Sequence, residues 1–328
     1  MLPKVSIIIP TYNRAKYLVQ AIESALAQDY PNLEVVVSDN CSTDETQTVV
    51  KNFLNDKRFK YFRNEKNLGM VGNWRKALYE YITGEWAIIL SDDDYFIDNQ
   101  YISKAIDLIN ENRDIVIVHA NQITYYENED KKIFLKKTFP IVMNGKNVFF
   151  NYYEKGLTFA FATTVFNVKL MRDLEVFKYD KVISSDWLEF LRLCLYGNVG
   201  FIDDFVSVYR RHDNSVLTTS NFDTFIENTK YITIPYEYAK RKKVFSSKDL
   251  EKWKERMLKR YFNSLLSIVL KKGNIKDLLH FVIFIKRNYP KYLVLFIYPK
   301  NLVKLFVYKI PLLHKLYLVL RKNKKCAE

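Results

Sequence analysis

The sequence predicts an α/β fold built on a mostly parallel sheet. In the first 90 residues, apolar β-branched segments alternate with segments of helical periodicity, which is typical of parallel sheets with helices on both faces. The apolar segments are continuous rather than alternating, as in strands that are buried on both faces. Polar residues follow these segments directly, at the edge where such sheets bind ligands.

The first strand, helix and strand are the clearest elements. Residues 5–10 (VSIIIP) predict a buried strand, and residues 15–28 carry apolar side chains at helical spacing. Residues 29–32 (DYPN) end that helix, and residues 33–37 (LEVVV) predict the second strand.

The next elements repeat this order. Ser42 and Glu45 match a capping box, so we expect a helix over residues 43–54. A strand, a helix and a strand follow at residues 60–63, 73–82 and 86–90. The pattern after residue 100 is mixed. It predicts helices at 101–111 and 186–195, strands at 115–119, 122–126, 199–202 and 206–209, a charged turn at 127–132, and mostly helix from 221 onward.

Three adjacent carboxylates, Asp92, Asp93 and Asp94, begin where the strand at 86–90 ends. Such carboxylates repel one another and are costly to bury unless a cation meets them. Thr11-Tyr12 and Asp39-Asn40 lie at two other strand ends, so we expect the three segments to share one crevice. The cluster suits Mg²⁺ or Mn²⁺, which would hold a departing nucleoside diphosphate. The alternative is a solvated loop that caps a helix.

Five segments carry a resemblance to a known family. They are VSIIIPTYNRAKYLVQAIESALAQDYPNLEVVVSDNCSTDET, RNEKNLGMVGNWRKAL, ILSDDDYF, SSDWLEFLRL and YRRHDNS. On these residues the chain resembles the family 2 glycosyltransferases, which have the GT-A fold. The resemblance implies an inverting transfer of a sugar from a UDP-sugar, with Mn²⁺ or Mg²⁺ at the DXD site. It also implies a catalytic domain over residues 1–215, followed by a helical basic region over residues 216–328.

The same resemblance implies roles for individual residues. Those expected to bind the nucleotide sugar are Pro10, Thr11, Tyr12, Asp39, Asn40, Arg63, Asn67, Asp92, Asp93, Arg210 and Arg211. Tyr12 would pack on the base and Asp39 would recognise uracil, although Asn40 replaces the second acid of the family's pair. Asp93, Asp94 and His212 would contact the metal, and the run of three aspartates leaves open which of them ligates it directly.

An inverting transfer also needs a base that takes the proton from the attacking hydroxyl. Asp186 precedes an apolar helix and corresponds to the family's acidic residue there, so it is the expected catalytic base. The alternative for Asp186 is ordinary helix capping. Glu189, one turn later, is the second choice.

Positive charge gathers at the end of the chain. Residues 240–328 contain 24 Lys and Arg against 5 Asp and Glu, a charge of +19, which leaves −5 on the rest. In residues 301–320, lysines and Pro311 interrupt an apolar, aromatic run that is too short to span a bilayer, a pattern that fits a helix lying in the membrane interface. We therefore expect peripheral binding to the inner face of the cell membrane and a polyprenyl-linked saccharide acceptor, in bacterial surface polysaccharide or glycan synthesis. The alternative is a helical region packed on the catalytic core.

Two other functions are weighed against this one. A pI near 9.3 would also suit a nucleic-acid-binding protein, but no nucleic-acid motif is present and the basic charge coincides with apolar helices, so we expect no nucleic-acid partner. A non-catalytic scaffold is disfavoured by the intact acidic cluster and by Asp186. Cys41, Cys194 and Cys326 form no CxxC pair, so neither a disulfide framework nor a zinc site is expected, and a cytoplasmic location fits best.

Overall fold

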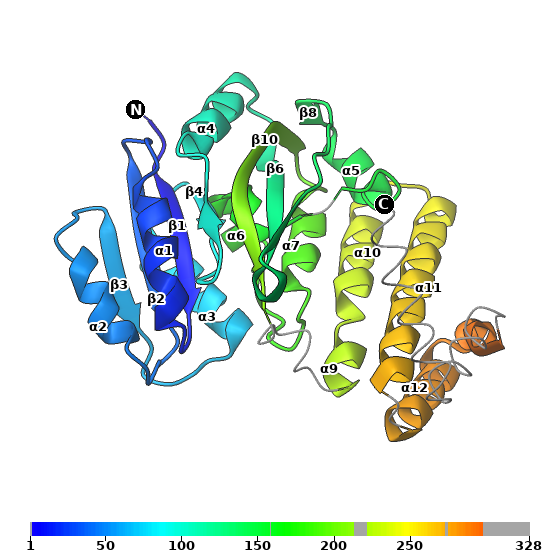
Figure 1. The fold of residues 1–328 in the computed structure, drawn as a ribbon. Coiled ribbons are helices and arrows are strands. Elements are labelled where there is room, and N and C mark those ends of the chain that lie inside the picture. The colour runs from blue at the N-terminus through cyan, green and yellow to red at the C-terminus, as the bar shows by residue number, and fades with distance from the viewer. Residues whose placement is uncertain (1, 158, 213–221, 273–274, 298–328) are drawn as a thin grey trace. The chain divides into compact units, whose positions relative to one another are not determined.

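The computed structural model describes residues 2–157, 159–212, 222–272 and 275–297 (Figure 1). The chain divides into two compact units, Met1–Phe245 and Ser246–Glu328. The division therefore falls after Phe245, whereas the sequence pattern places it after residue 215. Helices α9 (Phe222–Glu227) and α10 (Lys230–Lys242) belong to the first unit, where Arg192 of α7 (Ser185–Leu193) donates a 2.9 Å hydrogen bond to the Tyr238 hydroxyl of α10.

The predicted α/β architecture is confirmed. Within the described residues, ten strands form one sheet, whose main path runs β3-β2-β1-β4-β9-β6-β10-β5. The four parallel strands at one end are β1 (Val5–Thr11), β2 (Leu33–Asp39), β3 (Phe59–Arg63) and β4 (Trp86–Ile89). The carboxyl ends of β1, β2 and β4 therefore lie together at one edge, as the sequence predicts.

The second half of the sheet departs from the expected pattern. β6 (Ile115–Tyr126) and β10 (Asn198–Arg211) are each one long strand where two short ones were expected. Irregular pairing between Ile202 and Ser207 lets β10 continue through its polar segment. The charged turn expected at 127–132 forms over residues 127–130, and β7 (Lys131–Phe134) then pairs with β6. β9 (Thr164–Asn167) is an unpredicted antiparallel strand between β4 and β6.

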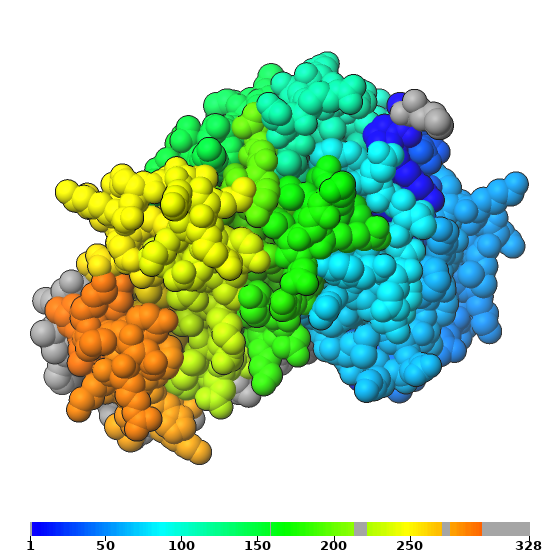
Figure 2. All heavy atoms as spheres, turned by 180° about the vertical axis from the view of Figure 1, so that it is seen from behind, coloured from blue at the N-terminus to red at the C-terminus, as the bar shows by residue number. Residues whose placement is uncertain are grey.

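Helices cover both faces of the sheet. α1 (Ala15–Leu26) and α4 (Tyr101–Glu111) bury their apolar sides with the β1 and β2 side chains that share one face. α3 (Met70–Lys76) lies on the other face, where Asn73 accepts a 2.7 Å hydrogen bond from Ser38 of β2. α3 begins three residues before the expected range of 73–82, and it continues as the π-helix η2 (Ala77–Tyr81). On the face seen in Figure 2, the segment around η2 adjoins the segment around α6 (Val168–Asp173), and Arg172 of α6 donates to the Leu78 carbonyl.

The predicted capping box does not form. α2 (Thr46–Val50) begins three residues later than expected and continues as the 3-10 turn η1 (Lys51–Phe53). Asp44 accepts hydrogen bonds from the Thr46 backbone and hydroxyl at 3.1 and 2.6 Å, so it holds the first turn that Ser42 was expected to cap. The remaining short elements of the first unit are β5 (Tyr95–Phe96), η3 (Glu127–Glu129), β8 (Val142–Met143), α5 (Gly145–Asn151), η4 (Phe161–Thr163) and α7 (Ser185–Leu193).

The described part of the second unit contains α11 (Ser247–Lys272), α12 (Ile275–Asn288) and the 3-10 segment η5 (Pro290–Ile297). It has an aromatic core of its own, in which Phe262 contacts Phe281, Phe284 and Tyr292. Across the described ranges, no helix has the length and apolar character needed to cross a bilayer. The interfacial helix expected over residues 301–320 lies outside the described residues.

Candidate functional site

Two turns at the sheet edge are joined to each other. The turn after β1 contains Asn13 at φ 55° and the turn after β2 contains Cys41 at φ 68°, a left-handed conformation that Asn tolerates better than most residues. The Asn13 N–H donates to the Ser42 hydroxyl at 2.9 Å, and Asn13 Oδ1 accepts from the Thr43 N–H at 2.7 Å. Asp44 also accepts from the first N–H of α1, at Ala15. These bonds fix the backbone beneath the strand ends.

The acidic cluster meets a cation that the sequence analysis did not name. Arg14 Nη1 donates to Asp92 Oδ1 at 3.1 Å and to Asp93 Oδ2 at 2.5 Å. On the other side, Asp93 Oδ2 lies 2.9 Å from His212 Nε2. Arg14 ends the same PTYNR motif that supplies Tyr12, so the need of three carboxylates for a counter-charge was the signal that could have identified it.

Burial perturbs two of the three aspartates. It raises the pKa of Asp92 to about 6, an effect that Arg14 opposes and the charge of Asp93 reinforces. Burial, with the neighbouring charge of Asp93, raises the pKa of Asp94 well above its usual range. Asp94 is buried and accepts a 2.9 Å hydrogen bond from the Arg210 N–H. Asp94 therefore ties β10 to the acidic loop, which differs from its expected role as a metal ligand.

Arg210 is engaged on every side by protein groups. Its guanidinium donates to the Asp93 carbonyl at 3.0 Å and to Gln20 at 2.6 Å, and it pairs with Glu127 at 3.3 Å. The rings of Tyr17, Tyr95 and Tyr125 surround it at 4.9 to 5.7 Å. Two residues later, His212 stacks on Tyr17. Arg210 thus positions the strand end that carries His212.

A pocket of about 400 Å³ opens beside the cluster. Nine of the residues predicted for the site line it: Pro10, Thr11, Tyr12, Asn40, Asn67, Asp92, Asp93, Arg210 and His212. Seven residues that were not predicted also line it: Arg14, Gly69, Met70, Asn73, Trp74, Ser91 and Tyr209. The Tyr12 ring is 45% exposed, so a flat apolar surface is available beside the charged groups.

Five predicted residues do not line the pocket: Asp39, Arg63, Asp94, Asp186 and Arg211. Asp39 is fully buried. It accepts from the Ser42 N–H at 2.8 Å and from the Tyr61 hydroxyl at 2.6 Å, and it pairs with Arg63 at 3.5 Å. In this arrangement Asp39 and Arg63 hold the turn after β2. Asp39 would have to give up one of these three partners before it could bind the uracil ring of a nucleotide. Arg211 lies over the rings of Tyr126 and Tyr209.

Asn40 uses both ends of its amide to hold the loop before α3. Its Nδ2 donates to Asn67 at 2.8 Å and to the Gly69 carbonyl at 3.1 Å, and its Oδ1 accepts from the Leu68 N–H at 2.8 Å. A carboxylate could not make the two donor bonds. The replacement of the family's second acid by Asn40 therefore orders one wall of the pocket.

Two side chains at the pocket wall could contribute to a divalent-metal site. Asp93 and His212 supply one carboxylate and one imidazole at the pocket wall, both of which Mn²⁺ accepts as ligands. Among the described residues, no group of three or more His, Cys, Asp or Glu side chains is arranged to hold a metal ion. A metal held by Asp93 and His212 would need further ligands, which diphosphate oxygens and water could supply.

Asp186 lies in the first turn of α7, as predicted. Desolvation raises its pKa to about 6, while hydrogen bonds from the N–H groups of Trp187 and Asp186 act in the opposite direction. Glu189 is fully buried, where it pairs with Arg192 at 2.5 Å and accepts from the Phe177 N–H at 2.9 Å. Because those partners occupy it, Glu189 holds α7 in place.

Comparison with known proteins places this geometry in a family. The sequence model described as Glycosyl transferase family 2 matches residues 6–175, just over half of the chain. A stretch of 95 residues is 43% identical to the GalNAc(5)-diNAcBac-PP-undecaprenol beta-1,3-glucosyltransferase of Campylobacter jejuni, covering 28% of this chain and 30% of that protein. A stretch of 117 residues is 35% identical to the poly(ribitol-phosphate) beta-N-acetylglucosaminyltransferase TarS of Staphylococcus aureus, covering 35% of this chain and 20% of that protein. The matches thus span less than a third of these curated relatives.

Solved structures share the fold at lower identity. The crystal structure of S. aureus TarS 1-349 in complex with UDP-GlcNAc superimposes with a TM-score of 0.68 at 19% identity, covering 89% of this chain and 83% of that one. The mannosyltransferase PcManGT from Pyrobaculum calidifontis, in complex with GDP-Man and Mn²⁺, superimposes with a TM-score of 0.54 at 17% identity, covering 94% and 85%. The chain therefore belongs to glycosyl transferase family 2 and has the GT-A fold.

Proposed function

We propose that this protein transfers a sugar, with inversion, from a UDP-sugar to a saccharide acceptor carried on a polyprenyl lipid. The observation that carries the proposal is the pocket at the ends of β1 and β4, where an exposed tyrosine ring lies beside paired carboxylates, a guanidinium and an imidazole. This combination suits a ligand with a flat base at one end and a diphosphate at the other. The names of the relatives support the donor and acceptor classes, because TarS was crystallised with UDP-GlcNAc and the Campylobacter relative is named for an undecaprenol-linked substrate.

Each wall of the pocket has a task in this proposal. Tyr12 stacks on the uracil, and Asn40 holds the loop that carries Asn67 and Gly69 against the nucleoside. Asp93 and His212 are the residues that would hold Mn²⁺ or Mg²⁺, whose charge would stabilise the departing diphosphate. Arg14 pairs with Asp92 and Asp93 and can turn toward the diphosphate when a metal neutralises those carboxylates.

Asp186 takes the proton from the acceptor hydroxyl in this proposal. Its pKa of about 6 leaves it ionised at neutral pH and more basic than an ordinary aspartate. Both properties suit a general base.

The second unit would bring the protein to its acceptor by binding the membrane. We assign the second unit to peripheral binding at the inner face of the cell membrane, which would bring the protein to a lipid-linked glycan in surface polysaccharide or glycan synthesis. The described helices α11 and α12 carry most of the basic charge of that unit's described part. Each basic residue near an anionic leaflet contributes about 1 kcal/mol to such binding.

The test compares the wild type with Asp186→Asn in a transfer assay with UDP-sugars, Mn²⁺ and a polyprenyl-linked acceptor. We expect the variant to lose at least about 100-fold in kcat while it still binds UDP. Asp173→Asn, which removes an exposed carboxylate paired with Lys169, is the matched control and should keep full activity. Transfer that survives in Asp186→Asn, or a product with retained anomeric configuration, would contradict the proposal.

A further inference from the structure

The first unit contains another pocket, at the opposite edge of the sheet from the candidate site. It measures about 580 Å³ and lies where β6 and β10 begin. Because β4 and β6 both pair antiparallel with β9, they run in the same direction, so the start of β6 lies at the edge opposite the carboxyl end of β4. We call it the α5–α10 pocket, since α5 and the end of α10 (Figure 1) contribute to its lining, and none of its described lining residues lines the candidate site.

The turn between α7 and β10, residues 194–198, holds two other segments of the chain against it. A Cβ atom on Gly145 would lie 1.9 Å from the Gly197 carbonyl oxygen, and one on Gly197 would lie 2.5 Å from the Asp114 carbonyl oxygen. The Asn198 N–H also donates to that Asp114 carbonyl at 2.7 Å. The starts of α5 and β6 are therefore fixed against this turn by close backbone contacts, which leave no room for a side chain at either glycine.

These contacts bring three basic residues from distant parts of the chain to one pocket. Arg113 lies just before β6, Lys146 is in the first turn of α5, and Lys242 is the last residue of α10. The Lys242 ammonium lies 3.4 Å from the centre of the Tyr196 ring, so the end of α10 is held at the same turn. An ammonium has three N–H donors, and a ring on one side leaves the others available to a ligand.

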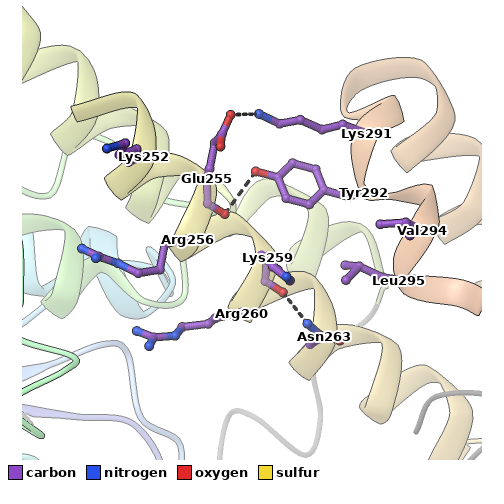
Figure 3. Close-up of a pocket in the computed structure, with 10 residues that line it drawn as sticks. All are labelled: Lys252, Glu255, Arg256, Lys259, Arg260, Asn263, Lys291, Tyr292, Val294 and Leu295. Atoms are coloured by element: carbon purple, nitrogen blue, oxygen red, sulfur yellow. Dashed lines mark hydrogen bonds and ion pairs between the residues drawn. The ribbon is translucent and has the colours of Figure 1, made fainter. Parts of the chain in front are cut away.

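No carboxylate among the described residues neutralises these three cations. Asp114 is the one acidic residue of the described lining, which has a formal charge of +2, and it forms no ion pair with any of the three. Burial, together with the charge of Lys146, lowers the pKa of Lys242. In the pocket between α11 and η5, by contrast, Glu255 pairs with Lys291 (Figure 3). The α5–α10 pocket thus holds like charges close together, and an anion would relieve their repulsion.

The donors of the α5–α10 pocket match the oxygens of a phosphate group. Arg113 offers a planar fork of N–H groups, while Lys146 and Lys242 offer compact charges with several donors each. The Asn198 amide also lines the pocket, and no described residue takes a hydrogen bond from it. A phosphate in the pocket would therefore find charge and hydrogen-bond donors on three sides.

We propose that the α5–α10 pocket binds a phosphate group through Arg113, Lys146 and Lys242. This site goes beyond the proposed sugar transfer, with which it shares no residue, so the two can fail independently. A soluble phosphate and the headgroup of an anionic lipid both present such a group, and two arms of the experiment separate these sources.

The first arm titrates inorganic pyrophosphate against the full chain by calorimetry, without added metal. Lys146→Gln/Lys242→Gln removes two exposed cations from the pocket. Lys51→Gln/Lys57→Gln removes the same charge from exposed positions that do not line it and is the matched control. We expect the pocket variant to bind pyrophosphate about 10-fold more weakly and the control less than about 2-fold more weakly. Circular dichroism establishes that both variants are folded.

Lysine acetylation of the wild type shows where the anion binds. Mass spectrometry follows the rate of modification at Lys146 and Lys242, with Lys51 as the reference, in the presence and absence of pyrophosphate. A bound anion covers the two ammonium groups and favours their charged, unreactive form. We expect pyrophosphate to slow acetylation at least about 3-fold at these two lysines and to leave Lys51 unchanged.

The second arm measures sedimentation with vesicles of phosphatidylcholine, alone or with about 30% phosphatidylglycerol. If the pocket variant loses affinity for pyrophosphate but binds anionic vesicles as the control does, the site takes a soluble phosphate. If it also loses vesicle binding, the site takes a lipid headgroup. Equal weakening by the pocket and control substitutions in both arms, absence of binding in both arms, or equal slowing of acetylation at Lys51 would overturn the pocket and leave only the general attraction of a basic protein for anions.

Discussion

Replacing Arg14 with glutamine tests whether this residue is the counter-charge of the acidic cluster. Arg14 donates to Asp92 and Asp93, whose side chains are only 6% and 13% exposed, while its own side chain is 26% exposed. A hydrogen bond to a charged group contributes about 1.5–3 kcal/mol when buried, and solvent at Arg14 reduces this. We therefore expect Arg14→Gln to cost about 2 kcal/mol in total, or about 4–8 °C in Tm for a unit of this size.

The loss of stability should depend on pH. The folded-state pKa of Asp92 is raised to about 6, whereas an unfolded aspartate titrates near pH 4. A raised carboxyl pKa makes folding less favourable above pH 6, and this cost disappears as the pH falls and the folded state takes up a proton. Arg14 relieves the cost only while Asp92 is ionised. The difference between variant and wild type should therefore be largest at pH 8 and smaller at pH 5.

Thermal unfolding followed by circular dichroism at pH 8 and pH 5 measures both effects. Arg58→Gln is the matched control, because it breaks the solvent-exposed pair of Arg58 with Asp56 at 2.8 Å and should cost less than about 1 kcal/mol at either pH. A Tm drop for Arg14→Gln that is equal at the two pH values, or no larger than that of the control, would refute the reasoning.

Three further predictions follow from the same geometry. Tyr12→Ala should weaken UDP binding in calorimetry by about 3–10-fold while Tyr12→Phe leaves it unchanged, since the ring contributes stacking; equal losses in both would contradict this. Glu34 is buried, and although desolvation raises its pKa, hydrogen bonds from Lys60, Ser6 and Thr83 lower it to about 2. Glu34→Gln should therefore cost about 3 kcal/mol of unfolding free energy at pH 7 and progressively less as the pH falls from 4.5 toward 2, and a pH-independent loss in denaturant titrations would count against it. Because Asp186 must be ionised to act as a base, kcat of the wild type should fall about tenfold per pH unit below pH 6, whereas a flat profile between pH 5 and 8 would exclude it.

The parallel strands could be predicted because a continuous run of apolar β-branched residues is typical of a strand buried on both faces. VSIII and LEVVV are buried along their whole length, and such continuous β-branched runs fit a sheet covered on both faces. β9 could not be found in the same way, since TVFN is too short to show a period and its pairing with β4 and β6 is set by the tertiary structure. The capping box failed because Ser42 accepts a bond from Asn13, a partner that is distant in sequence.

The sequence predicted where the candidate site lies in the sheet, but it did not predict which protein groups its charged residues contact. The placement of Asp92 and Asp93 follows from the rule that ligands bind beyond the carboxyl ends of parallel strands. Which cation would meet them depended on the turn after β1, which aims Arg14 at the cluster. The burial of Asp39 and the enclosure of Arg210 by three tyrosine rings are likewise products of packing. A residue's type and position at a strand end do not show how many protein partners it has already taken.

The central claim is that UDP and a divalent cation bind together in the pocket at the ends of β1 and β4. Crystals of the full chain grown with UDP and MnCl₂ and measured at the manganese absorption edge test it directly. The account predicts an anomalous peak in contact with Asp93 and His212 and a uracil ring stacked on Tyr12. A manganese peak away from Asp93, or UDP bound outside this pocket, would contradict it.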